Sequence, residues 1–396
     1  MNAMGVPSDS INVYDLDGGY MAALYNHLKE SGMEVIKLNL GKNLGDLLTK
    51  GLLQLETPCD ILVAGPPCPP WAGQGTHNGM QDCRAAVFIR VLMWVFFFVK
   101  CGGLLACILE NVEGIETLRH GRDSAVNHFL TVLRKCIPEF VWCVDKLVLT
   151  NYALPHTRVR VFLRGVRRIV SEFVPKCLSP FGTTLLRDFL GHYPHTPRST
   201  YTGPQQQNLL DYEQVIRERV KQGTLQRGDI VVISVDRGQG RAYKAPLTVN
   251  NVPTLTTRNQ YLMLVSVHDV IDNTPDEQRE YFRKIHDVER LQLQGLPASL
   301  LAQLPAGKAL KASGNAYPVP LIIAVLQPIL MEVSKKIHLP SWPPPEIVSS
   351  RPDGLGDFHR ALKALPRIIC KKKHAEHMAK VKAFLKKRKR RDSDSD

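Results

Sequence analysis

The chain has 396 residues, of which 44% are hydrophobic and 22% are charged, and its formal net charge is +14. This length supports one large or two medium domains, and the composition excludes wholesale disorder. In the most hydrophobic region the longest uncharged run, Val91–Val99, is far shorter than the roughly 20 residues that cross a bilayer, so no membrane span is expected. The nine cysteines form no Cys-x-x-Cys pair, which argues against a disulfide framework and against a structural zinc site.

Most of the positive charge lies in a tail. Residues 367–396 hold 12 Lys and Arg against 4 Asp and Glu. The basic runs 371–373 and 386–391 are open to three interpretations: a nuclear-import address, a phosphate-binding arm, or a solvated end. We predict a nuclear location from this tail. Residues 1–10 lack the basic start and the apolar run of a signal peptide.

The first 165 residues alternate strand-like and helix-like segments. This alternation is typical of a parallel sheet with crossover helices, and it predicts a doubly wound, mostly parallel α/β fold. The expected strands span residues 11–15, 59–64, 104–109, 141–149 and 159–166, and the expected helices span 21–30, 84–99 and 124–136.

After residue 166 the pattern changes. Proline and glycine become frequent from 175 to 204, and short strand-like runs follow at 230–235 and 261–267 without alternating helices. This pattern predicts a smaller, irregular second domain. Helical character returns at residues 287–294 and 319–335, and the latter segment is apolar enough to pack on the first domain. The expected division is a catalytic and cofactor-binding part at 1–166, a second domain at 167–311, a returning segment at 312–339, and a proline-rich linker with the basic tail at 340–396.

Ligands of open α/β sheets bind at the carboxyl ends of the strands, where one cysteine stands out. Cys68 lies in the sequence Gly-Pro-Pro-Cys-Pro-Pro-Trp, residues 65–71, directly after a predicted strand. A lone cysteine is more often a small core residue. Here the flanking prolines stiffen the loop and deny it regular hydrogen bonding, which favours a presented thiol.

Charged side chains follow two other predicted strands. Glu110 comes directly after an apolar strand, where a carboxyl group can keep a raised pKa and donate a proton; the alternative is a helix N-cap. Arg158 and Arg160 lie two residues apart on a strand, so both face the same side and could hold a carboxylate, a phosphate or a nucleic-acid backbone. The alternative for this pair is two surface arginines on an edge strand.

In this order and at these spacings, Cys68, Glu110 and the Arg158-x-Arg160 pair resemble the Pro-Cys loop, the Glu-Asn-Val motif and the Arg-x-Arg strand of the cytosine-C5 DNA methyltransferase family. The similarity covers residues 11 to about 335. Further matching segments are Asp82-Cys83-Arg84 and residues 253–256, 289–297 and 314–316. The resemblance implies a Rossmann-like methyltransferase sheet, with residues 167–311 as a target-recognition domain.

The resemblance also implies a mechanism. Cys68 would add to C6 of cytosine, and Glu110 would hydrogen-bond and protonate N3. Arg158 would orient the base or Glu110, and Arg160 would support the loop that carries Cys68. The methyl donor would be S-adenosylmethionine and the substrate DNA, whose target base must be flipped out because C6 is inaccessible inside a duplex. RNA is the less favoured substrate, and a non-catalytic nucleic-acid-binding homologue is a competing interpretation from another class.

The chain departs from the family at the cofactor. We find no glycine-rich Phe-x-Gly-x-Gly-Gly loop. In the favoured alignment Asp15 ends the family's second strand and binds the ribose, Asp46 and Leu47 contact the adenine, and Pro67 and Asn315 complete the cofactor site. A rival alignment takes residues 15–19 as a degenerate glycine loop. The explanations left open are a start codon assigned too far downstream, a degenerate gene copy, or a missing piece that another chain supplies.

Overall fold

The computed structural model describes residues 11–15, 36–40, 60–72, 79, 82, 84–101, 103–117, 124–236, 247–257, 261–305, 307–337 and 360. Its main sheet has the strand order β3-β4-β7-β5. β4 is parallel to β3, and β7 is antiparallel to both β4 and β5, so three of these four strands point the same way. The mostly parallel α/β fold expected from the sequence is confirmed. The four strands, in chain order, are Ile61–Ala64, Ala106–Val112, Phe140–Val148 and Val159–Arg167.

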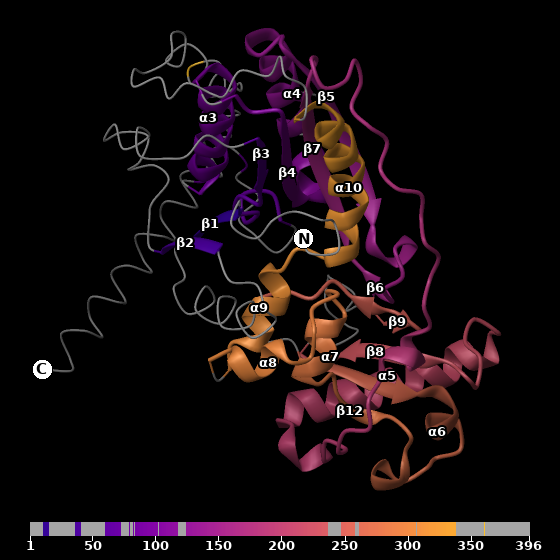
Figure 1. The fold of residues 1–396 in the computed structure, drawn as a ribbon. Coiled ribbons are helices and arrows are strands. Elements are labelled where there is room, and N and C mark those ends of the chain that lie inside the picture. The colour runs from indigo at the N-terminus through magenta and orange to yellow at the C-terminus, as the bar shows by residue number, and fades with distance from the viewer. Residues whose placement is uncertain are drawn as a thin grey trace, which may run out of the picture.

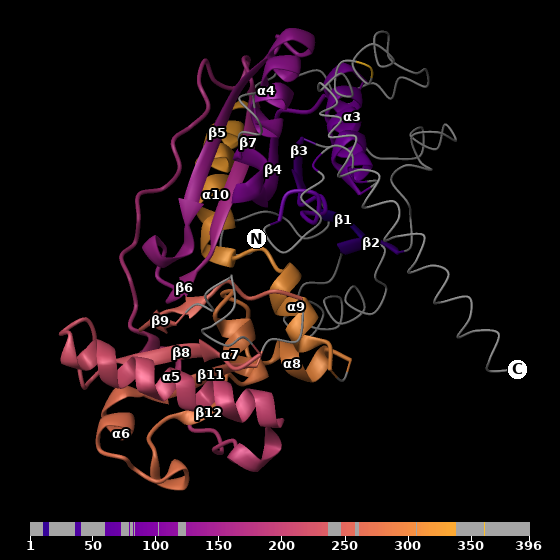
Figure 2. The same cartoon turned by 180° about the vertical axis from the view of Figure 1, so that it is seen from behind.

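Helices cover both faces of this sheet (Figures 1 and 2). Side chains alternate along β4: Cys107 and Leu109 join the core formed with α3 and α4, whereas Ala106 and Ile108 join the core formed with α10. Most residues of α3 are apolar and buried, and its two charged residues are Arg90 and Lys100. The helices span Ala85–Cys101 (α3), Ala125–Cys136 (α4) and Val319–Ile337 (α10).

One helical stretch among the described residues, 309–335, has the length and hydropathy of a membrane-spanning segment. Its apolar character has a second explanation within the fold. Leu321, Val325 and Ile329 of α10 are fully buried in the core on one face of the main sheet. The absence of a membrane span stays a prediction.

β4 extends further than the sequence indicated. The predicted strand ended at residue 109, but β4 continues to Val112 because its ladder with β7 continues: Glu110 lies opposite Phe162, and Val112 lies opposite Arg160. Glu110 is therefore held on a strand rather than on a loop after one, and this excludes the helix N-cap alternative.

Near the N-terminus, β1 (Ile11–Asp15) pairs in parallel with β2 (Ile36–Leu40) as a separate two-stranded sheet. β1 has the predicted bounds, and Asp15 lies at its carboxyl end. Sequence analysis did not anticipate β2. The helix expected at 21–30 lies outside the described residues.

The second domain is more regular than its sequence suggested. Its antiparallel sheet has the order β12-β11-β8-β9, formed by Phe282–Lys284, Leu262–Ser266, Ile230–Ser234 and Thr248–Val249. The 19-residue helix α5, Gly203–Lys221, packs on one face of this sheet together with α6, Val267–Ile271. Sequence analysis missed α5, so the expectation that no helix accompanies these short strands was wrong.

The reason for this miss is the composition of α5. The helix buries few apolar side chains, among them Leu209 and Ile216, and most of its other positions are polar. The available signal was at its start. Thr202 and Gln205 form a capping box with a proline in the first turn, and both features mark a helix N-terminus.

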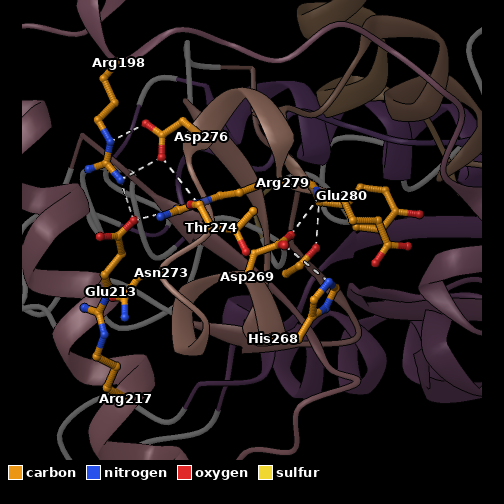
Figure 3. Close-up of polar contacts among 12 residues, drawn as sticks. Arg198, Glu213, Arg217, His268, Asp269, Asn273, Thr274, Asp276, Arg279 and Glu280 are labelled. Atoms are coloured by element: carbon orange, nitrogen blue, oxygen red, sulfur yellow. Dashed lines mark hydrogen bonds and ion pairs between the residues drawn. The ribbon is translucent and has the colours of Figure 1, made fainter.

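A network of charged side chains joins α5 to the segments that carry Arg198, Asp276 and Arg279 (Figure 3). Glu213 of α5 accepts hydrogen bonds from Arg198 at 2.5 Å and from Arg279 at 2.7 Å, and Arg198 also pairs with Asp276. Both guanidinium groups lie about 5 Å from the ring centroid of Phe282. Moving α5 would separate Glu213 from both arginines and leave uncompensated charge, which is strongly destabilising. The network therefore fixes the position of α5.

An extended segment, residues 168–185, runs along the outside of the molecule from the end of β7 to the second domain (Figures 1 and 2). The chain returns through three short helices, α7, α8 and α9, to α10. These short helices are Asp287–Gln292, Leu300–Gln303 and Ala309–Asn315, and the other short elements are β6 (His156–Thr157), β10 (Val252–Pro253) and the single turns η5 (Glu113–Glu116), η6 (Leu149–Asn151), η7 (Leu186–Phe189), η8 (Arg198–Thr200) and η9 (Asp276–Gln278).

His156 joins the two domains at the β6–β10 pair. Its Nε2 accepts the N–H of Leu255 at 3.0 Å, which leaves Nδ1 as the donor to the carbonyl of Leu293 at 3.2 Å. The ring is completely buried, and burial together with the nearby charge of Arg158 lowers the pKa of His156 to about 3. A neutral imidazole therefore bonds to two segments that are distant in the sequence.

We predict that His156 makes folding sensitive to mild acid. Its pKa is about 3 in the folded chain and 6.5 in the unfolded chain, so only the unfolded chain binds the proton between these values. Between pH 7.5 and pH 5.0 this difference removes about 2 kcal/mol from the free energy of unfolding. Urea unfolding of wild type and of His156→Gln, which keeps a donor and an acceptor, should differ by that amount in their pH dependence. Parallel pH profiles would contradict the assignment.

Candidate active site

The loop that carries Cys68 is anchored on the C-terminal side of the thiol. The Cys68 carbonyl accepts the N–H groups of Trp71 and Ala72, both at 2.9 Å. Trp71 is 3% exposed, and its ring lies edge-on to Phe88 of α3 with centroids 5.4 Å apart. Cys68 itself is half-buried. The loop therefore holds the thiol in a partly enclosed place at the carboxyl end of β3.

Two residues that sequence analysis did not select hold this loop against β4 and η5. Asn111 is 2% exposed, and its Nδ2 donates to the carbonyl of Pro66 at 3.3 Å. On the other side, Gly114 approaches the loop so closely that a Cβ there would lie 2.0 Å from the carbonyl oxygen of Trp71. The Glu-Asn-Val motif contained the signal for Asn111, because a buried amide beside the candidate acid must find partners.

Glu110 and Arg160 form an ion pair beside the thiol. Oε1 of Glu110 lies 2.5 Å from Nε of Arg160, and the two side chains are 13% and 8% exposed. The charges of Arg160, Glu110 and Arg158 all act on the Cys68 thiol, so the four predicted catalytic side chains share one site. The alternative of two surface arginines is excluded, since Arg158 and Arg160 are both buried.

Arg158 binds three backbone carbonyl groups. Its Nη1 donates to Leu255 at 3.2 Å, and its Nη2 donates to Gly314 at 3.1 Å and to Ala316 at 2.9 Å. The side chain is 2% exposed. Arg158 therefore ties the main sheet to the segment after β10 and to the end of α9.

The contacts of the two arginines differ from those expected. Arg160, rather than Arg158, binds Glu110, and the hydrogen bond from its Nη1 goes to the carbonyl of Val159 rather than to the Cys68 loop. The register explains the difference. Arg160 lies opposite Val112 at the end of β4, whereas Arg158 precedes β7 and lies beyond the reach of the β4 ladder. Which arginine contacts the base stays a prediction.

The environment of Cys68 disfavours its ionised form. Burial raises the pKa of the Cys68 thiol, the charge of Arg160 opposes that effect, and the charge of Glu110 adds to it. The thiol is therefore protonated near neutral pH in the free site. Burial and the charge of Arg160 also lower the pKa of Arg158. Its N–H groups still donate hydrogen bonds to three carbonyl groups.

Comparison with known proteins identifies the family. The family described as C-5 cytosine-specific DNA methylase matches residues 24–331. The chain belongs to this family. Type II methyltransferase M.DsaV of Dactylococcopsis salina is 23% identical over 295 residues, which cover 73% of this chain and 74% of that protein. M.NlaX of Neisseria lactamica is 25% identical over 273 residues, covering 68% and 75%.

The fold has a counterpart among solved structures. A mutant of Spodoptera frugiperda DNMT2 superposes with a TM-score of 0.50 at 15% identity, over 83% of this chain and 94% of that chain. At this identity the likeness is one of fold. It supports the Rossmann-like methyltransferase fold expected from the motifs.

C5 DNA methyltransferases use S-adenosylmethionine as the methyl donor. Of the residues predicted to bind it, Pro67 and Asn315 are described and exposed. Their two segments are adjacent, because Tyr317 contacts Gly65. An exposed amide and an exposed pyrrolidine on these adjacent segments suit the methionine end of the cofactor. Asp46 and Leu47 lie outside the described residues, and of Asp15 the structure describes the backbone.

We predict that alkylation reports the electrostatics of this site. The rate at which iodoacetamide labels Cys68 should rise about tenfold per pH unit from pH 7 to pH 9, because the thiolate fraction limits the reaction and the pKa of Cys68 lies above its usual range. Labelling is measured on the Cys68 peptide by mass spectrometry. A plateau below pH 8 would show that the thiol is already ionised and would contradict this account.

Two variants sharpen this prediction in opposite directions. Glu110→Gln removes a negative charge, so it lowers the pKa of Cys68 and accelerates labelling at pH 7.5. Arg160→Met removes a positive charge, so it raises that pKa and slows labelling. If both variants were labelled at the wild-type rate, neither charge would act on the thiol.

Proposed function

We propose that the chain methylates C5 of cytosine in DNA through a covalent bond between Sγ of Cys68 and C6 of the base. The observation that carries this proposal is the joint placement of a thiol, a carboxylate and two guanidinium groups at the ends of β3, β4 and β7. Family membership supports the reaction. The structure adds that the pKa of the Cys68 thiol is raised before substrate binds.

The protonated thiol of Cys68 can supply the proton that N3 of the base requires. C5 of cytosine is a poor nucleophile until a thiolate adds to C6, and this addition is easier when N3 is protonated. In the free site Cys68 is protonated, and the carboxyl group of Glu110 lies against Arg160. Net transfer of one proton from the thiol to N3, with Glu110 as the relay, activates both partners and leaves the total charge unchanged.

The remaining steps follow from the same side chains. S-adenosylmethionine supplies the methyl group for C5, and Pro67 and Asn315 would hold its methionine end. Loss of the C5 proton to solvent then forms the C5–C6 double bond and expels Cys68 as a thiolate, which regains its proton from N3 through Glu110. Arg160 holds the carboxylate of Glu110 in place, and Arg158 fixes the backbone on the opposite side of the site.

The assignment of the other regions follows the same proposal. Residues 167–311 contain a sheet distinct from the main one, and we propose that they read the DNA target. A strand with the glycine-rich loop, supplied by another chain, is a further proposal. It is supported by the described part of the chain, in which β3 pairs with β4 and the β1–β2 pair forms a separate sheet.

A trapping experiment tests the covalent step. A DNA duplex in which cytosine is replaced by 5-fluorocytosine is incubated with the chain and S-adenosylmethionine. Fluorine at C5 cannot leave as a proton does, so the adduct should persist in a denaturing gel. Wild type and Cys143→Ala, which alters another half-buried thiol, should form it, and Cys68→Ala should not.

Glu110→Gln should slow formation of the adduct about 10²- to 10⁴-fold, because an amide cannot relay the proton. The same variant is expected to label faster with iodoacetamide, so loss of the thiol cannot explain its defect. An adduct that persists in Cys68→Ala would refute the proposal. An RNA duplex of the same sequence tests the alternative substrate.

A further inference from the structure

Tyr317 occupies the space beside the first residue of the Cys68 loop. A Cβ at residue 65 would lie 1.8 Å from Oη of Tyr317 and 2.3 Å from its Cζ. Real Cβ atoms do not approach other atoms this closely, so only glycine fits at residue 65 while the tyrosine ring holds its position. Gly65 directly follows β3, which ends at Ala64.

The backbone on both sides of Tyr317 is itself fixed. Arg158 binds the carbonyl groups of Gly314 and Ala316, just before Tyr317 in the chain. Gly314 packs so tightly that a Cβ there would lie 2.5 Å from the backbone of Thr256. After Tyr317, the N–H of Val319 donates to the carbonyl of Gln294 at 2.9 Å. The ring of Tyr317 therefore projects from an immobilised segment.

The loop has three supports, which come from two parts of the chain. Asn111 holds Pro66, and the backbone of Trp71 lies against Gly114. Both of these contacts come from the end of β4 and the turn after it. Tyr317 is the support at the start of the loop, and it comes from the segment between α9 and α10.

We propose that Tyr317 is a positioning residue for Cys68, and that its ring, wedged against Gly65, sets how deeply the loop holds the thiol. The significance of this role for methylation rests on the proposed function, but the role itself does not. The contacts connect Arg158 to the loop through the segment 314–317. Support of the loop, which sequence analysis assigned to Arg160, thus reaches it from Arg158 through Tyr317.

Loss of the ring has a chemical consequence that can be measured. Burial is the largest cause of the raised pKa of Cys68. A loop without its wedge exposes the thiol, which brings the pKa back toward its ordinary value and makes labelling faster at neutral pH. Displacement of the sulfur also costs turnover, because misplacement by about 1 Å can reduce a rate about a hundredfold.

The test is a double-mutant cycle on the full chain that combines Gly65→Ala with Tyr317→Ala. The measured quantities are the pH profile of Cys68 labelling by iodoacetamide and the midpoint of thermal unfolding. Each single variant should label several-fold faster at pH 7.5. In the Tyr317→Ala background, Gly65→Ala should change the rate less than twofold, because the atom with which the new methyl group would collide is gone.

Two further variants keep the outcome interpretable. Tyr317→Phe retains the ring and should label within about threefold of wild type. Gly228→Ala, at an open position where a Cβ meets nothing within 4 Å, controls for the general effect of the substitution. The proposal would be overturned if Gly65→Ala changed the labelling rate by the same factor in wild type and in Tyr317→Ala. A labelling profile in Tyr317→Ala equal to that of wild type would also overturn it.

Labelling does not require DNA or S-adenosylmethionine. A chain that fails the 5-fluorocytosine trap but shows the coupling between Gly65 and Tyr317 would refute the proposed function and leave the positioning role intact. A chain that forms the adduct but shows no coupling would do the reverse.

Discussion

The structure depends on one buried guanidinium group. Arg158 binds the carbonyl groups of Leu255, Gly314 and Ala316, and so joins the main sheet to the return from the second domain and to the segment before α10. A hydrogen bond to a charged group contributes roughly 1.5–3 kcal/mol. Since His156 joins the same regions through Leu255 and Leu293, the two domains meet at polar contacts made by neighbouring residues of the β6–β7 region.

This scaffold maintains an electrostatic condition at the site. A thiol held partly out of water stays protonated, and the carboxyl group of Glu110 beside it is paired with a buried arginine. The thiol is therefore not in its reactive form before the base arrives. The arrangement restricts reaction of the thiol with other electrophiles and couples its ionisation to protonation of the substrate, which explains why a nucleophile with a raised pKa suits this chemistry.

Much of this could be predicted from the sequence, because strands β3, β4, β5 and β7 have clear apolar runs and the four reactive residues lie on these strands or close to their ends. Other features could not. The helix α5 buries too narrow an apolar stripe to reveal its period, and the end of β4 depends on a partner about 50 residues away. The contacts of Arg158 and Arg160 depend on register, which spacing alone does not specify. The contact between Tyr317 and Gly65 joins positions about 250 residues apart, so it could be recognised only in three dimensions.

The most direct test of the account is identification of the methylated product. Duplex DNA is incubated with the chain and with S-adenosylmethionine labelled in its methyl group, then digested to nucleosides and analysed by mass spectrometry. The account predicts label in 5-methyldeoxycytidine with wild type and none with Cys68→Ala. Label that persists in Cys68→Ala, label in another nucleoside, or no label from a folded chain that binds both DNA and S-adenosylmethionine would contradict it.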